Sequence, residues 1–144
     1  MTPHTKNILV AIDGSLNANR AFNQAVQLAQ KFKANLYLTR VVEDYYLNED
    51  DGILQMVNYE DNPDVIEARD DLNQKFMMTV YPIKDTFLRI GDPKKIISNY
   101  LVRGLKIDLL VIGKNGKSNN QQASLGKIAG FLKANASCQV LIVE

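Results

Sequence analysis

The sequence predicts an α/β fold built around a parallel β-sheet. Short apolar segments alternate along the chain with longer segments in which apolar residues recur at helical spacing. The first short segment, Asn7–Ile12 (NILVAI), is apolar after its first residue, as is typical of a strand buried on both faces. Right-handed crossovers join parallel strands, so helices are expected in the connections. Ligands are expected beyond the carboxyl ends of the strands.

The first strand leads directly into the first helix. Asn7–Ile12 ends abruptly at Asp13-Gly14-Ser15, and either Asp13 or Ser15 is suited to cap the helix that follows. That helix is expected from Asn17 to about Lys33, because its apolar residues form one continuous stripe.

The second strand is predicted at Asn35–Val42 (NLYLTRVV), which is rich in β-branched and aromatic residues. A long acidic connection follows it, in which Ile53–Val57 is expected to form a short helical turn. Pro63 then precedes a helix expected from about Asp64 to Met77, with one apolar face.

The remaining elements continue the same alternation. A third strand is predicted at Ile83–Ile90, and Asp92 caps a helix that starts at Pro93 and runs to about Arg103. Gly104 is expected to end that helix. The last predicted elements are a buried strand at Asp108–Ile112, a helix at Ser124–Ala134 and a final strand at Gln139–Val143.

Composition favours one cytoplasmic domain over residues 1–144. No apolar run approaches the roughly 18 residues that cross a membrane, no secretion signal is recognisable, and the single cysteine, Cys138, cannot form an internal disulfide. The net charge of +1 gives no electrostatic case for binding nucleic acid or a membrane. Residues 43–71 hold eleven of the sixteen acidic side chains. We interpret them as a solvated loop and helix face, the alternative being that the basic flanks attract an anion.

Three glycines follow the fourth predicted strand. Gly113, Gly116 and Gly126 precede or open a helix, where glycine lets a phosphate approach the backbone and the helix amides accept an anion. Lys114 and Lys127 would add positive charge. The alternative is that these glycines only serve turns.

The whole chain resembles the universal stress proteins. The resemblance is carried by NILVAIDGS at the start, Val41-Val42-Glu43, Gly91-Asp92-Pro93, and the tail DLLVIGKNGKS…LGKIAGFLKANASCQVLIV. It implies a three-layer open sandwich: a five-stranded parallel sheet with helices on both faces, Rossmann-like and similar to the adenine nucleotide α-hydrolases. It also implies a homodimer that pairs through Gln139–Val143, an edge strand.

In the nucleotide-binding branch of that family, the closing motif is G-x2-G-x9-G followed by Ser or Thr. Gly113, Gly116 and Gly126 match it, but Lys127 takes the hydroxyl position and could act only as a point charge. Asn115 stands where an arginine or histidine is common, and Asn119 where a further glycine is common. These departures concern the phosphate end of the implied site.

At the adenosine end, the resemblance assigns Asp13 to ribose or base contacts, Ala11 and Ile12 to the pocket wall, and Val41 to adenine. A carboxylate can accept a ribose hydroxyl proton, while helix capping is the alternative role for Asp13. The implied binding residues are Ala11, Ile12, Asp13, Val41, Gly113, Lys114, Asn115, Gly116, Gly126, Lys127 and Ile128.

These observations predict a stress-response or regulatory domain that binds ATP, or AMP or ADP, with Mg²⁺ only as a companion of the nucleotide. No general base is evident near the glycine segment, so no catalytic residue is assigned and turnover is expected to be weak at most. No protein metal site is expected, since His4 is the only histidine. Two alternatives remain: a dimeric scaffold that binds no nucleotide, and a slow ATPase.

Overall fold

The computed structural model describes residues 4–43, 59–114 and 126–144. It contains a five-stranded sheet in the order β3-β2-β1-β4-β5, and all four strand pairings are parallel. The strands are β1 (Asn7–Ile12), β2 (Asn35–Val42), β3 (Ile83–Ile90), β4 (Leu109–Gly113) and β5 (Gln139–Val143). The helical elements are α1 (Leu16–Phe32), η2 (Tyr59–Asp61), α2 (Pro63–Met78), α3 (Pro93–Lys95), η3 (Ile96–Val102) and α4 (Lys127–Asn135).

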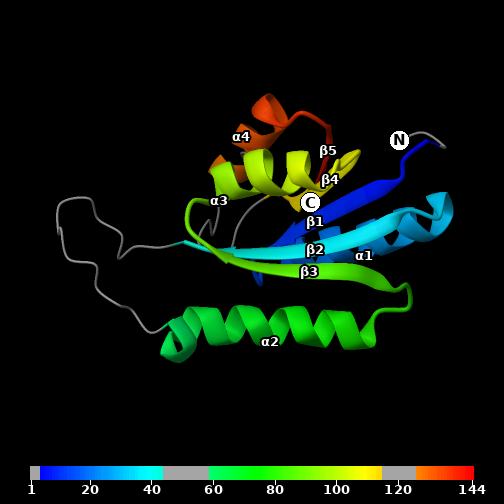
Figure 1. Cartoon of the computed structure of the whole chain (residues 1–144). Helices are drawn as coiled ribbons and strands as arrows, with labels where there is room; N and C mark the ends of the chain where they lie inside the picture. Colours follow the sequence, from blue (N-terminus) through cyan, green and yellow to red (C-terminus); the bar gives the residue numbers. More distant parts are fainter. Residues whose placement is uncertain (1–3, 44–58, 115–125) are drawn as a thin grey trace.

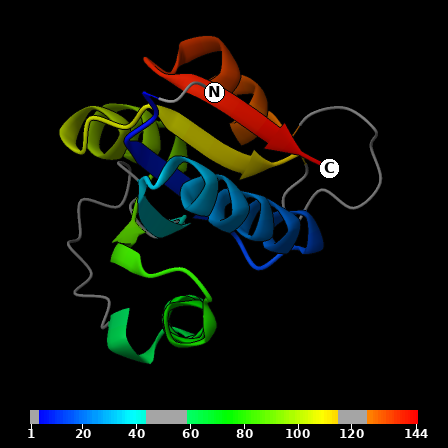
Figure 2. The same cartoon turned by 90° about the vertical axis from the view of Figure 1, so that its right-hand side faces the viewer.

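Helices cover both faces of the sheet, so the molecule has three layers (Figures 1 and 2). Alternate residues of β1 explain this arrangement: Ile8 and Val10 pack with α1 and α2 in one core, while Leu9 packs with η3 and α4 in the other. All three side chains are completely buried. The expectation of a parallel sheet between two helical layers is confirmed.

Four of the five strands have the bounds expected from the sequence, and the fourth is displaced by one residue. β4 begins at Leu109, the first residue of this segment that pairs with β1, and the Asp108 side chain forms hydrogen bonds just before it. Its Oδ2 accepts the N–H groups of Lys6 and Asn7, each at 2.9 Å, which links the start of β1 to the start of β4. At the other end, β4 extends to Gly113, which pairs with Val143.

The third helix ends at Gly104, as expected, but Gly104 is not the left-handed residue that closes it. The segment passes from α3 into π-helical η3 and remains helical through Gly104, and the chain reverses at Lys106, whose φ is +54°. Bonds from Lys106 N–H to the Arg103 carbonyl and from Ile107 N–H to the Val102 carbonyl close this end. These bonds satisfy carbonyls at the end of the helix, and so stabilise a left-handed lysine.

The last helix also begins later than expected. The sequence places its start at Ser124, which lies outside the described residues, so that Gly126 would be helical. Instead Gly126 is extended (φ −60°, ψ 153°) and α4 begins at Lys127. The Gly126 N–H is bonded to Lys114 rather than to a preceding helical turn. The short turn expected at Ile53–Val57 also lies outside the described residues.

Candidate functional site

The sheet opens at the carboxyl end of β1. Pairing of β1 with β2 ends at Ile12–Arg40, and pairing of β1 with β4 ends at Ala11–Ile112. The strand order also reverses here, since β2 and β3 lie on one side of β1 while β4 and β5 lie on the other. Such a switch point is where open parallel sheets bind ligands. The structure therefore brings the strand-end residues predicted for the site, Ala11 to Asp13, Val41 and Gly113, to one edge.

Val41 presents its backbone to this opening. The Val42 carbonyl accepts the Gly91 N–H at 2.9 Å, so the Val42 peptide faces β3. Successive residues of a strand turn their peptide groups to opposite sides, so Val41 directs its own toward β1. Its carbonyl lies beyond the last β1–β2 pair, while its side chain packs against the η3 and α4 core. An apolar wall and a backbone acceptor thus meet at one residue.

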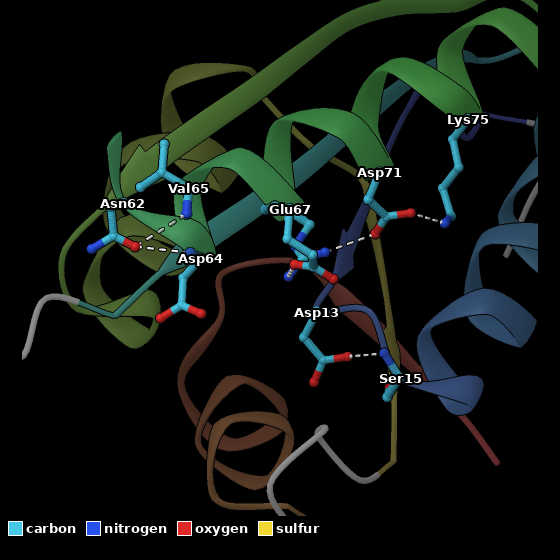
Figure 3. A network of polar contacts seen from close by, with 9 residues as sticks. Asp13, Ser15, Asn62, Asp64, Val65, Glu67, Asp71 and Lys75 are labelled. Carbon is cyan, nitrogen blue, oxygen red and sulfur yellow. Dashed lines mark hydrogen bonds and ion pairs between the residues drawn. The ribbon is translucent and has the colours of Figure 1, made fainter. Parts of the chain in front are cut away.

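Asp13 organises the turn between β1 and α1. Its Oδ1 accepts the Ser15 N–H at 3.0 Å (Figure 3). The Ser15 Oγ in turn accepts the Ala18 N–H at 3.1 Å. Ser15 is therefore the cap of α1, and the alternative role of Asp13 as the cap is wrong. The side chain of Asp13 stays in the turn at the mouth of the opening.

Gly113 has a packing role in addition to its place in the glycine motif. A Cβ at this position would lie 2.9 Å from the Ala18 nitrogen, 2.9 Å from the Asn17 carbonyl carbon and 3.0 Å from the Asn17 Cβ. The end of β4 therefore touches the first turn of α1, and only glycine fits without movement of the backbone. The spacing of the motif alone did not indicate this contact.

Lys114 and Gly126 hold the two ends of the glycine segment together. The Lys114 N–H donates to the Val143 carbonyl at 2.8 Å, and the Lys114 carbonyl accepts the Gly126 N–H at 2.7 Å. Asn115 and Gly116, both predicted to contact phosphate, lie outside the described residues. Because the Gly126 N–H is used within the chain, the described part of this segment offers an anion the backbone donors of the first turn of α4.

That first turn supplies backbone N–H donors of the kind that bind an anion. Helix N–H groups at Lys127 and Ile128 have no partner within the helix, and no side chain of the described residues caps Gly126. The Lys127 side chain is exposed, whereas Ile128 packs its side chain against the η3 and α4 core. Ile128 can therefore contribute only its backbone N–H to a ligand.

Lys114 is paired in the described structure. Its Nζ lies 2.8 Å from Glu144 Oε1, and the ammonium holds the pKa of the Glu144 carboxyl below its usual value. The Lys114 side chain is largely covered while that of Glu144 is exposed. The positive charge expected at this end of the site is present, but a carboxylate already contacts it.

Arg40 is a notable residue that sequence reasoning missed. It is 7% exposed and lies on β2, with its guanidinium paired to Glu67 and Asp71 of α2. The signal was available, because one arginine interrupts the otherwise uncharged strand NLYLTRVV. Its partners could not be recognised within a segment interpreted as a solvated acidic face.

An open parallel sheet with a crevice at its switch point defines the doubly wound class of α/β proteins. Within that class, the family model of the universal stress proteins matches residues 4–144. The chain belongs to the universal stress protein family.

Individual relatives agree with this assignment. A putative universal stress protein of Staphylococcus aureus (strain USA300) is 32% identical over 143 residues, covering 96% of this chain and 84% of the relative. The solved universal stress protein UspA from Lactobacillus plantarum has a TM-score of 0.81 at 29% identity, covering 97% and 98% of the two chains. A universal stress protein solved in complex with cAMP has a TM-score of 0.71 at 22% identity and covers 97% of both chains.

Two absences hold for residues 4–43, 59–114 and 126–144. Across these ranges, no group of three or more His, Cys, Asp and Glu side chains is arranged to hold a metal ion. None of their helices combines the length and apolar character that crossing a membrane requires.

Proposed function

We propose that this chain is a stress-response regulatory domain that binds an adenine nucleotide (ATP, ADP or AMP) in the opening beside β1, without efficient turnover. The observation that carries the proposal is the loss of β1 pairing on both sides at one point, after Ile12 toward β2 and after Ala11 toward β4. Backbone groups and the Asp13 turn border this opening, which suits a ligand with a flat base and a hydroxylated sugar.

The adenosine end is assigned to β1 and β2. The Val41 carbonyl can accept a proton from an exocyclic amine, and its side chain supplies an apolar wall. The Asp13 carboxylate is at the mouth of the opening, where it can accept a ribose hydroxyl proton. Ala11 and Ile12 are almost fully buried, so they form the floor of the site rather than a polar contact.

The phosphate end is assigned to the start of α4. This helix has no acidic residue in its first turn and begins instead with Lys127. A cation at a helix N-terminus is unfavourable with the helix dipole, and a bound phosphate would offset that cost. Any Mg²⁺ would arrive with the phosphates, and no chain ligand is assigned to it.

The comparisons support the ligand class without fixing the nucleotide. A structural neighbour over 97% of this chain was solved with cAMP, which contains both adenine and phosphate. At 22% identity this likeness establishes the shared fold, so the ligand is proposed here on the geometry described above.

A homodimer is a second, compatible proposal, and it rests on β5. This strand is at the edge of the sheet and has no charged residue in Gln139–Val143. Leu141 and Val143 pack toward α1, Ile142 packs toward the other core, and all three remain partly exposed. An apolar, uncharged edge strand is a template for pairing, so we propose that a second copy covers it.

Isothermal titration calorimetry tests the nucleotide proposal. Protein freed of nucleotide by unfolding and refolding is titrated with ATP, AMP and adenosine, and with GTP as a control for the base. We expect saturable heat with the three adenine ligands and a much weaker response to GTP. Absence of heat with every adenine ligand at high micromolar protein would refute nucleotide binding and favour the alternative of a dimeric scaffold that binds no nucleotide.

A further inference from the structure

A partly buried ionic cluster lies behind the turn that carries Asp13. Arg40 Nη2 is 2.5 Å from Glu67 Oε2, and Arg40 Nη1 is 2.9 Å from Asp71 Oδ2. Lys75 pairs with the other carboxylate oxygen of Asp71. The acidic partners and Lys75 lie along one side of α2 (Figure 3).

The pattern of α2 explains why these charges meet. Val65, Ala68 and Leu72 anchor the helix on the sheet. Glu67, Asp71 and Lys75 follow one another at spacings of four residues, so they form a second, polar stripe beside the apolar one. A buried guanidinium is costly unless it is paired. Arg40 therefore fixes which part of α2 lies over the end of β2.

The cluster also touches the β1–α1 turn. Gly14 has φ +84°, and a Cβ added there would lie 3.0 Å from Glu67 Oε1 and 3.3 Å from Arg40 Nη1. The Arg40–Glu67 pair is thus packed against the backbone of Gly14. The two neighbours of Gly14 are joined by a hydrogen bond, because the Asp13 carboxylate accepts the Ser15 N–H.

From these contacts we infer that Arg40, held by Glu67 and Asp71, is a positioning residue for the Asp13–Gly14–Ser15 turn. It supports the turn from behind, so that the Asp13 carboxylate keeps one orientation at the opening. Together with Lys75, it also balances the charge of two carboxylates that would otherwise repel an anionic ligand. The consequence for ligand affinity rests on the proposed nucleotide function, whereas the support of the turn does not.

Amide hydrogen exchange of the ligand-free protein tests the support of the turn. The reporters are the N–H groups of Ser15 and Ala18, which donate to Asp13 and Ser15. In Arg40→Met we expect these amides to exchange about tenfold faster or more, through local opening. Val111, which is completely buried in β4, reports global unfolding and should change far less.

Two further variants keep the test decisive. Glu67→Gln weakens the Arg40–Glu67 pair, which touches Gly14. Because the Glu67 side chain is 44% exposed, this variant should fold even if Arg40→Met does not. Lys75→Met is the matched control: it removes one positive charge from the same cluster but not from the Gly14 contact, and the turn amides should change less than about twofold. Arg40→Lys should restore part of the protection.

Adenosine titration of the same variants separates this inference from the proposed function. We expect affinity to fall about tenfold in Arg40→Met and to be partly restored in Arg40→Lys, with Lys75→Met near wild type. Faster turn exchange with no adenosine binding in any protein would support positioning while refuting the nucleotide proposal. Wild-type binding and unchanged turn exchange in both Arg40→Met and Glu67→Gln would overturn the inference.

Discussion

The Gly126 N–H donates a hydrogen bond to the Lys114 carbonyl at 2.7 Å, which joins the end of β4 to the start of α4. Lys114 and Gly126, the described residues on either side of 115–125, are therefore in direct contact. Gly126 has an extended backbone conformation, and α4 begins at the next residue, Lys127. The donors of the helix start are consequently held at a fixed place relative to the strand that ends the sheet.

A first prediction concerns Gly113. Gly113→Ala should destabilise the fold by roughly 1–3 kcal/mol, because its methyl group would overlap the first turn of α1. Chemical denaturation measures the change. The matched control is Gly130→Ala inside α4, where a Cβ meets nothing within 4 Å. The higher helix propensity of alanine should stabilise the fold by up to about 1 kcal/mol there. Equal effects of the two substitutions would contradict the packing role.

A second prediction concerns Lys127. Lys127→Ala should weaken ATP binding about three- to tenfold at low salt and leave adenosine binding unchanged, because a point charge acts only on the phosphates. Calorimetry at two salt concentrations measures both effects. Lys133→Ala, in the last turn of the same helix, is the control and should match wild type. An equal loss for adenosine and ATP would show that Lys127 does not act through phosphate.

A third prediction concerns the Lys114–Glu144 pair. In Lys114→Met the pKa of the Glu144 carboxyl should rise toward its ordinary value of 4.5, because the neighbouring ammonium is gone. A lowered pKa in the folded state stabilises the protein above the unfolded-state pKa, and this stabilisation is lost as the pH falls through the folded-state value. NMR titration of the side-chain carboxyl gives the pKa in each variant. An unchanged value would mean that the pair does not form in solution.

A fourth prediction concerns the edge of β5. The Val143 carbonyl bonds to Lys114, so the neighbouring Ile142 turns its N–H away from β4. Ile142→Pro should therefore remove an outward donor without breaking the β4–β5 ladder, and so convert a dimer to a monomer. Ile142→Ala loses similar packing but keeps the N–H, and should remain dimeric. Light scattering at tens of micromolar protein decides, and a monomeric wild type would refute the dimer.

The fold was largely predictable because its strands are short apolar runs with clear ends. NILVAI, for example, predicts a strand buried on both faces, and β1 occupies the centre of the sheet. The start of α4 was not predictable, because it depends on a hydrogen bond between Gly126 and Lys114, which are far apart in the sequence. Local sequence equally did not show that Lys106 rather than Gly104 takes the left-handed conformation.

The site was predictable only in outline. The positions of Asp13, Val41 and Gly113 follow from their places at strand ends, since carboxyl ends of parallel strands share one edge. The contact of Gly113 with α1 and the contact of Arg40 with Gly14 depend on tertiary packing. Asp71 lies 31 positions from Arg40, so no local pattern pairs them. Two side chains of the acidic segment, Glu67 and Asp71, are therefore paired with the buried Arg40 and are not part of a purely solvated face.

The most direct test of the nucleotide proposal is an NMR titration of ¹⁵N-labelled protein with AMP. We predict saturable shifts that are largest at the amides of Asp13 to Ser15, Val41 and Val42, with Lys127 and Ile128 responding to AMP but not to adenosine. Shifts at none of these amides at millimolar AMP, or shifts confined to the outer edge of β3, would contradict nucleotide binding at the β1 opening.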